Sequence, residues 1–190
     1  DLAVHSMKDV PTELPEGLFI GIVPARETPR DAFLSNHCPS VAALPDGARV
    51  GTSSLRRKSQ LAAVRPDLAI LDLRGNVDTR LRKLDEGQYD AIILAGAGLN
   101  RLGLQGRLTV ALDPAVMLRA IGQGGLGFEL RGDDSELLEQ LQFLHDPRTA
   151  TAVAAERDFL LRLEGGCQVP IGAHAEVDGA TVRLTGLIAR

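Results

Sequence analysis

Residues 49–98 read RVGTSSLRRKSQLAAVRPDLAILDLRGNVDTRLRKLDEGQYDAIILAGAG. Three short apolar runs end in turns of small or polar residues, and two stretches with helical spacing, Leu55–Val64 and Val77–Leu84, separate them. Strands that alternate with helices of this length indicate βαβ units and a parallel sheet, hence an α/β fold. Ligands bind at the carboxyl ends of such strands. The turns expected at this edge are 51–54, 74–76 and 95–98.

Outside this stretch the pattern is less regular. Alternating or apolar runs predict strands at residues 1–6, 18–23 and 126–130. Helical spacing predicts helices at 135–144, with Ser135 as the N-cap, and at 149–163. Residues 175–187 indicate a hairpin about Asp178-Gly179, and we expect it to begin a separate domain.

Composition excludes several classes of protein. The 190 residues carry a net charge of -4 and only 3% aromatic side chains, which disfavours a nucleic-acid binder. Two cysteines are too few for a disulfide scaffold and suit a reducing compartment, so we expect a cytoplasmic location. No apolar run has the length of a membrane span. The chain starts and stops within apparent strands, so we expect it to be a fragment.

Four arginines follow the ends of the central strands. Arg56 and Arg57 lie in the first turn of a helix, where positive charge opposes the helix dipole and a bound polyanion would compensate it. Arg74 closes the next strand and Arg80 lies early in the next helix. For any one of them, a solvated arginine paired with a nearby acid is at least as good a reading. Together they favour a site for carboxylates or phosphates.

Two further positions have both a chemical and an ordinary reading. Asp9 follows a strand beside Lys8 and is either a turn residue or a carboxylate kept ionised by nearby cations, facing a developing positive charge. Cys167 lies between two glycines and a nearby proline, which favours a presented thiol, although a lone cysteine is usually a small buried hydrophobe. His37 and Cys38 lack a second pair at ligand spacing, so no metal is expected.

Glycines 122, 124 and 127 fit the dinucleotide-binding pattern G-x-G-x-x-G only formally. That fingerprint requires a preceding strand and a helix that opens inside it, whereas here a strand follows. We expect these glycines to form a hinge or a close backbone approach to a ligand.

Together these motifs resemble the signature blocks of the porphobilinogen deaminase (hydroxymethylbilane synthase) family. The blocks occur in family order and span nearly the whole chain. They are HSMKDVP at 5–11, GTSSLRR at 51–57, LRGNV at 73–77, GQG at 122–124 and EGGCQVPIG at 164–172.

The resemblance implies two α/β domains similar to periplasmic binding proteins, joined by hinge crossings, and a small third domain. Residues 1–26 and 119–144 would then belong to domain 1, residues 28–118 to domain 2, and residues 147–190 to the start of domain 3. The family's N-terminal segment and the end of its third domain are missing, so we expect these 190 residues alone to be poorly stable and inactive.

The family's chemistry implies roles for individual residues. A dipyrromethane cofactor would be attached to Cys167 by a thioether, and four porphobilinogen molecules would be added to it with loss of ammonia before hydroxymethylbilane is released. This is a transferase reaction of porphyrin and heme biosynthesis. Asp9 would be the catalytic carboxylate. The other implied cofactor-binding residues are Ser6, Lys8, Thr52, Ser54, Arg56, Arg57 and Asn76. The implied substrate-binding residues are Arg74, Arg80 and Gln123.

The resemblance further implies a monomer that binds neither nucleic acid nor membrane. A noncovalent anion-binding module is the main rival reading, because an arginine-lined cleft would serve it equally well. It leaves Asp9 and the glycine loop around Cys167 without a purpose. A dinucleotide-dependent dehydrogenase is weaker still, since its glycine fingerprint lacks the required context.

Overall fold

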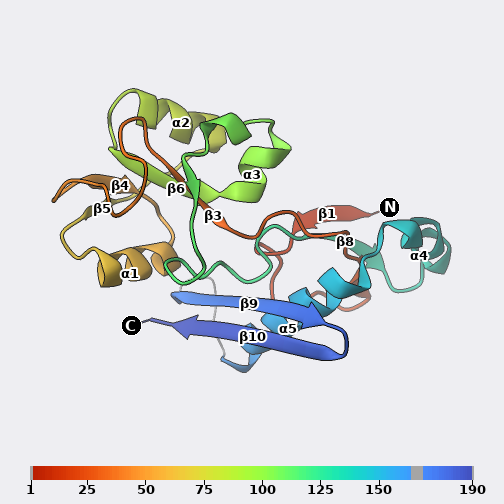
Figure 1. Cartoon of the computed structure of the whole chain (residues 1–190). Coiled ribbons are helices and arrows are strands. Elements are labelled where there is room, and N and C mark those ends of the chain that lie inside the picture. Colours follow the sequence, from red (N-terminus) through yellow and green to blue (C-terminus); the bar gives the residue numbers. More distant parts are fainter. Residues whose placement is uncertain (1, 164–168, 190) are drawn as a thin grey trace. The chain divides into compact units, whose positions relative to one another are not determined.

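The computed structural model describes residues 2–163 and 169–189 (Figure 1). These residues form two compact units. The first unit contains residues 2–29, 120–163 and 171–187, and the second contains residues 30–119 with 169–170 and 188–189. The chain therefore leaves the first unit after Pro29 and returns to it after Arg119.

The second unit is built on a mixed five-stranded sheet of order β5-β4-β6-β3-β7. β4 runs parallel to both β5 and β6, whereas β3 is antiparallel to β6 and β7. The strands are β3 Asp31–Leu34, β4 Arg49–Gly51, β5 Ala69–Leu71, β6 Ala91–Ala95 and β7 Val110–Ala111. The three parallel strands confirm the predicted edge, because their carboxyl ends lie on the same side of the sheet.

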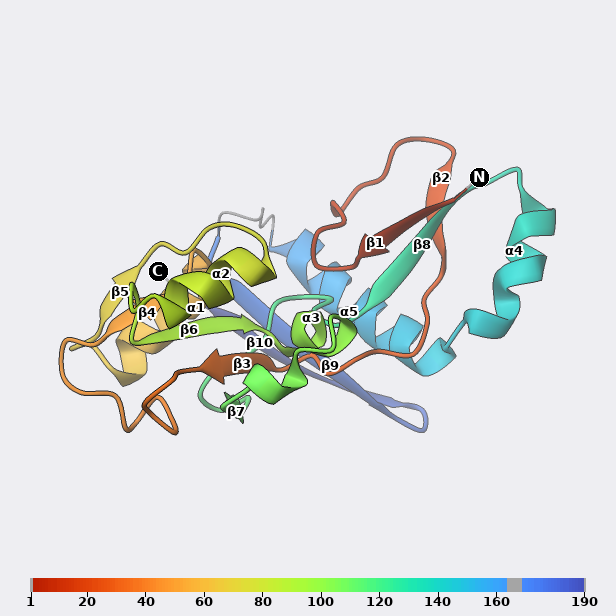
Figure 2. The ribbon, with the colours of Figure 1, turned by 90° about the horizontal axis from the view of Figure 1, so that it is seen from above.

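Helices α1 (Leu55–Val64), α2 (Val77–Asp85) and α3 (Gly96–Arg101) follow β4, β5 and β6 in turn, as can be traced in Figure 2. A short 3₁₀ turn, η1 (Gln105–Arg107), comes next. Neighbouring strand residues enter different apolar clusters: Phe33 packs with Leu61, and Leu34 packs with Leu81. This alternation buries both faces of the sheet.

The first unit contains a three-stranded antiparallel sheet of order β1-β8-β2 and a separate hairpin, β9 with β10. Helix α5 packs along β9. The first-sheet strands are β1 Ala3–Ser6, β2 Leu18–Ile22 and β8 Leu126–Arg131. The remaining elements are α4 Ser135–Leu141, η2 Gln142–Leu144, α5 Pro147–Arg162, β9 Ile171–Asp178 and β10 Thr181–Ile188.

Most predicted elements are confirmed, but four expectations need correction. The turn expected at 95–98 is the start of α3, which begins at Gly96. Asp134, and not Ser135, caps α4, because its carboxylate accepts the Leu137 N–H. The sheet is only partly parallel, and its strands β3 and β7 were not predicted at all.

The domain limits inferred from the resemblance stay a prediction. Residues 30–119 of the second unit nearly coincide with the range 28–118 assigned to domain 2. The described residues after 147 are grouped mainly with the first unit. A search of the described residues finds no helix long and apolar enough to cross a membrane.

Candidate functional site

The loop after β4 is rigidly held. Thr52 is buried, its N–H donates to the carbonyl of Leu71 at 2.9 Å, and its hydroxyl lies 3.3 Å from the Ser54 nitrogen. Ser53 bridges to the segment that follows β5, since its hydroxyl both donates to and accepts from the backbone of Leu73. Ser54 caps α1, with its oxygen 3.5 Å from the Arg57 nitrogen. Thr52 and Ser54 are thus placed at a helix N-terminus, as predicted.

Arg56 and Arg57 lie in the interior of the second unit and share the carboxylate of Asp31. Arg56 donates to Asp31 at 2.8 and 3.3 Å, and Arg57 donates at 3.0 and 2.6 Å. Both also donate to backbone carbonyls, Arg56 to Leu118 and Arg57 to Ile93. The three side chains are at most 9% exposed. Asp31, and not only a bound anion, therefore compensates the charge at the start of α1.

The charges of this cluster do not cancel. Two guanidinium groups face one carboxylate, so a net positive charge remains beneath the carboxyl edge. Burial raises the pKa of Asp31, but the charges of Arg57 and Arg56 outweigh it and hold this pKa below its usual value. Burial is the main cause that lowers the pKa of Arg56. Asp31 thus remains a carboxylate, and the site stays cationic.

Residues after β5 add further cations. Arg80 is half-buried, and its Nε donates to the carbonyl of Gly75 at 2.7 Å. Burial and then the charge of Arg57 lower the pKa of Arg80, which places these two guanidinium groups within electrostatic reach. Arg74 is 84% exposed and 3.9 Å from Asp72. Asn76 caps α2 by accepting the Thr79 N–H at 2.9 Å.

The charge of Arg57 acts on Arg80, and Arg57 shares the buried carboxylate of Asp31 with Arg56. Arg80 forms no ion pair with a carboxylate of the residues described. Arg74 lies in the same loop region but extends into solvent. The carboxyl edge thus combines a cationic interior with arginines that can still receive an anion.

The remaining predicted residues lie in the first unit. Ser6 ends β1, and its carbonyl accepts the Asp9 N–H at 2.9 Å, which forms a tight turn. Lys8 and Asp9 in this turn are exposed, whereas the flanking Met7 and Val10 are buried against Val153 of α5. The turn therefore presents two charged side chains from an anchored backbone. Cys167 lies outside the described residues.

Gln123 lies where the chain returns to the first unit. It is 1% exposed, and its Nε2 donates to the carbonyl of Pro29 at 2.7 Å, so it ties the two crossing segments together. Gly124 has a φ of +86°, and a Cβ there would lie 2.5 Å from the Glu27 carbonyl oxygen. The backbone at Gly124 therefore packs closely against the chain itself. Its approach to a ligand stays a prediction.

Glu156 of α5 is a polar residue that sequence reasoning missed. Its side chain is fully buried, accepts two hydrogen bonds from Arg26 at 2.7 and 3.0 Å, and accepts the N–H groups of Gly122 and Ala175. Nδ1 of His174 lies 3.3 Å from it. Asp31 was missed for the same reason: an acidic residue in a polar or strand-like run gives no signal for distant partners.

No cluster of three histidine, cysteine or acidic side chains suited to a metal ion occurs in the residues described. Cys38 is a free thiol of intermediate exposure.

Two family models match the chain. Residues 1–139 match "Porphobilinogen deaminase, dipyromethane cofactor binding domain", and residues 150–190 match "Porphobilinogen deaminase, C-terminal domain". Porphobilinogen deaminase from Syntrophobacter fumaroxidans is 61% identical over 189 residues, which is 100% of this chain and 61% of that protein. The enzyme from Roseiflexus sp. is 56% identical over 188 residues, 99% of this chain and 62% of that protein.

Solved structures match only distantly. A periplasmic substrate-binding protein of an ABC transporter from Coxiella burnetii has a TM-score of 0.45 and 14% identity, over 74% of this chain and 67% of that one. An arginine-specific periplasmic binding protein from Salmonella typhimurium has a TM-score of 0.41 and 14% identity, over 72% and 62%. These likenesses are too weak to add to the argument.

The chain spans about 60% of the length of the curated relatives it matches. The family models nevertheless cover both ends of the described sequence, and the identity extends over the whole chain. The chain therefore belongs to the porphobilinogen deaminase family.

Proposed function

We propose that the protein to which this chain belongs condenses porphobilinogen molecules, with loss of ammonia, into a linear tetrapyrrole that is released as hydroxymethylbilane. The observation that carries this proposal is the uncompensated positive charge at the carboxyl edge of β5-β4-β6. Arg56 and Arg57 share the Asp31 carboxylate, and Arg80, on which the charge of Arg57 acts, pairs with no carboxylate of the described part of the chain. Pyrroles with acetate and propionate groups are anionic ligands of the kind that such an edge attracts.

The residues present fit a dipyrromethane cofactor by the chemistry of their donors. Arg80 and Arg74 offer guanidinium groups, Thr52 and Ser54 lie at the N-terminus of α1, and the Arg56–Arg57 pair supplies positive charge. Ser6, Lys8 and Asn76 complete the proposed cofactor-binding set. When bound through Cys167, the cofactor would supply the acceptor end onto which the substrate is added.

Arg74, Arg80 and Gln123 are proposed to bind the substrate. Arg74 and Arg80 would hold ring carboxylates by bidentate hydrogen bonds, and these bonds orient a ring as well as attract it. Gln123 already donates to the Pro29 carbonyl, so its contribution would be to shape the backbone beside the substrate.

Asp9 is proposed as the catalytic carboxylate. It is exposed on a turn whose neighbours Met7 and Val10 are buried, so its backbone is fixed while its side chain remains available. An aspartate in this position would stabilise the positive charge that develops on a pyrrole as its amino group departs with a proton. We propose that the protein works as a monomer in the cytoplasm.

Intact mass of the denatured full-length protein, beside a Cys167→Ser variant, tests this proposal. A covalent increment equal to a dipyrromethane, absent from the variant, is expected. An unmodified mass from a folded preparation made with porphobilinogen present would refute the covalent mechanism and favour a noncovalent anion-binding module.

Asp9→Ala in the full-length protein tests the proposed catalytic role of Asp9. The variant is expected to carry the cofactor and to lose turnover. Normal turnover would refute the role of Asp9.

A further inference from the structure

Arg157 of α5 holds the loop that carries Asp9. Its Nη1 donates to the carbonyl of Val10 at 3.0 Å, and its Nη2 donates to the carbonyls of Pro11 at 2.6 Å and Thr12 at 3.4 Å. One side chain thus binds three consecutive carbonyl groups immediately after Asp9. These partners lie about 146 positions away in the sequence and belong to the same compact unit.

Partial burial of the charged Arg157 side chain costs free energy. Arg157 is half-buried, and burial lowers its pKa. Among the residues described, no carboxylate forms an ion pair with it, so the full charge is directed at backbone carbonyls. Hydrogen bonds from a charged donor are stronger than neutral ones. Arg157 therefore stabilises this loop more than a solvent-exposed arginine stabilises the helix that carries it.

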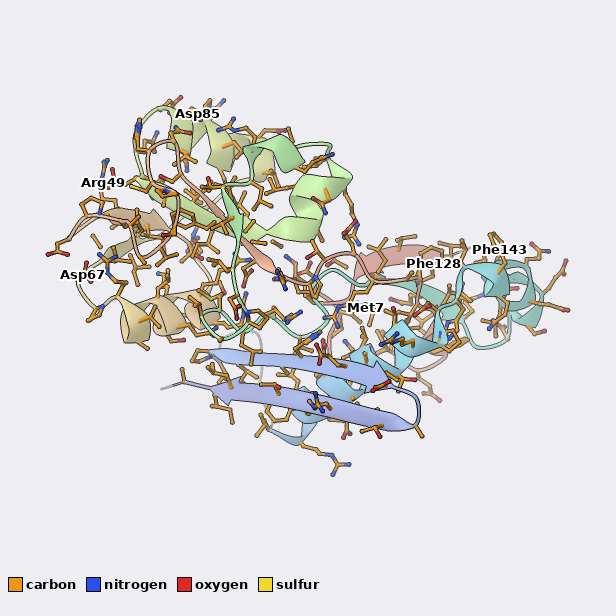
Figure 3. The ribbon with its side chains drawn as sticks, in the orientation of Figure 1. Met7, Arg49, Asp67, Asp85, Phe128 and Phe143 are labelled. Atoms are coloured by element: carbon orange, nitrogen blue, oxygen red, sulfur yellow. The ribbon has the colours of Figure 1, made fainter. Side chains whose placement is uncertain are left out.

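A second contact comes from the same face of α5. Val153, one turn before Arg157, packs against Met7 and Val10, the residues on either side of Lys8-Asp9 (Met7 is labelled in Figure 3). Met7 is further fixed because its N–H donates to the Gly125 carbonyl at 3.0 Å. The loop is thus gripped before and after Asp9, while the Asp9 side chain itself is exposed.

We propose that Arg157 is a positioning residue for the reaction: it fixes the backbone of residues 10–12 and so sets where the Asp9 carboxylate lies. This inference rests on the proposed function of Asp9. Helix α5, which carries Arg157, ends at Arg162, five residues before Cys167 in the sequence.

The test compares Arg157→Ala, Arg157→Lys and the control Arg162→Ala in the full-length protein. Arg162 lies on the same helix, is 76% exposed and, within the residues that the structure describes, pairs only with Asp158 of the same helix. Arg157→Ala is expected to keep its covalent cofactor and to lower kcat about tenfold or more, with little change in KM, because small displacements of a reacting group are costly. Hydrogen exchange of residues 7–13 is expected to accelerate in this variant.

Two rescue experiments separate positioning from general stability. Arg157→Lys should recover only part of kcat, since an ammonium group cannot span three carbonyls as a planar fork does. Millimolar methylguanidinium should raise kcat of Arg157→Ala and slow exchange in residues 7–13, with no effect on Arg162→Ala. If Arg157→Ala does not fold, Arg157→Lys carries the same comparison of kcat and exchange.

The proposal is overturned if exchange in residues 7–13 accelerates while kcat stays normal, or if kcat falls with no change in this exchange. A failure of the proposed function looks different. In that case Asp9→Ala would turn over normally or the parent protein would lack the cofactor mass, whatever Arg157 does to the loop.

Discussion

Replacing Glu156 by glutamine removes one charge from a fully buried side chain with almost no change in shape. The carboxylate of Glu156 faces both Nη atoms of Arg26 and two backbone N–H groups. A glutamine has only one oxygen to accept these four donors, and its NH₂ group meets a donor at the other position. The buried guanidinium of Arg26 also loses its counter-ion.

The size of the effect follows from the pKa of Glu156. Burial raises this pKa, but His174 and Arg26 outweigh burial and lower it from 4.5 to about 2. At about 1.4 kcal/mol per unit, ionisation of Glu156 stabilises the folded state by about 3 kcal/mol at neutral pH. Removing one partner of a buried ion pair costs a similar amount, about 3–5 kcal/mol. The two routes agree on a loss near 3 kcal/mol for Glu156→Gln.

Urea unfolding followed by circular dichroism measures this loss. Glu176→Gln is the matched control: this side chain is 63% exposed and 3.6 Å from His174, so its loss should change stability by less than about 0.5 kcal/mol. Because the folded pKa of Glu156 lies below the unfolded one, its contribution is complete above about pH 4.5. It should be lost as the pH falls toward 2, so that the gap between parent and variant narrows.

The reasoning is refuted if Glu156→Gln costs less than about 1 kcal/mol at pH 7, or if the gap between parent and variant is the same at pH 3 and pH 7. Either result would mean that the Arg26 guanidinium and the Gly122 and Ala175 amides do not depend on the charge of this carboxylate.

Three other outcomes are expected. Asp31→Asn should lower the free energy of unfolding by about 3–5 kcal/mol, because it leaves two buried guanidinium groups without a counter-ion; an unchanged urea midpoint would contradict this. Gly124→Ala should destabilise by more than Gly17→Ala, because both glycines have positive φ but only Gly124 lacks room for a Cβ; equal thermal midpoints would contradict the close approach. Arg80→Ala in the full-length protein should raise KM for porphobilinogen about tenfold or more, whereas an unchanged KM would remove Arg80 from the substrate site.

The local sequence pattern was sufficient to predict most elements of the second unit. The spacing of apolar residues predicted α1 with its observed bounds, and the turns after β4 and β5 lie at the carboxyl edge as expected. The turn expected at 95–98 was wrong because two glycines there suggested a loop, although backbone hydrogen bonding continues into α3. Strand β3 escaped prediction because its four residues begin with a charged one, Asp31, directly after a polar run.

The candidate site divides in the same way. Runs of residue types near strand ends identified Arg56, Arg57, Arg74 and Arg80, and the family motifs gave each a proposed role. The charge balance of these arginines was not predictable from the sequence. Asp31, the partner of Arg56 and Arg57, lies 25 and 26 positions before them, on β3, and β6 separates β3 from β4 in the sheet. The sequence therefore suggested a bound anion where the fold supplies a carboxylate.

The sequence by itself determined helices α1 and α2 of the second unit, the loops that carry candidate residues and the family. These depend on periodicity and on short motifs, which are properties of neighbours in the chain. Only the tertiary structure decided that Asp31 neutralises half of a buried arginine pair, that Glu156 ties four donors, and that Arg157 grips the loop after Asp9. Such contacts join residues far apart in the sequence, and a buried charge must find its partner wherever the packed chain places one.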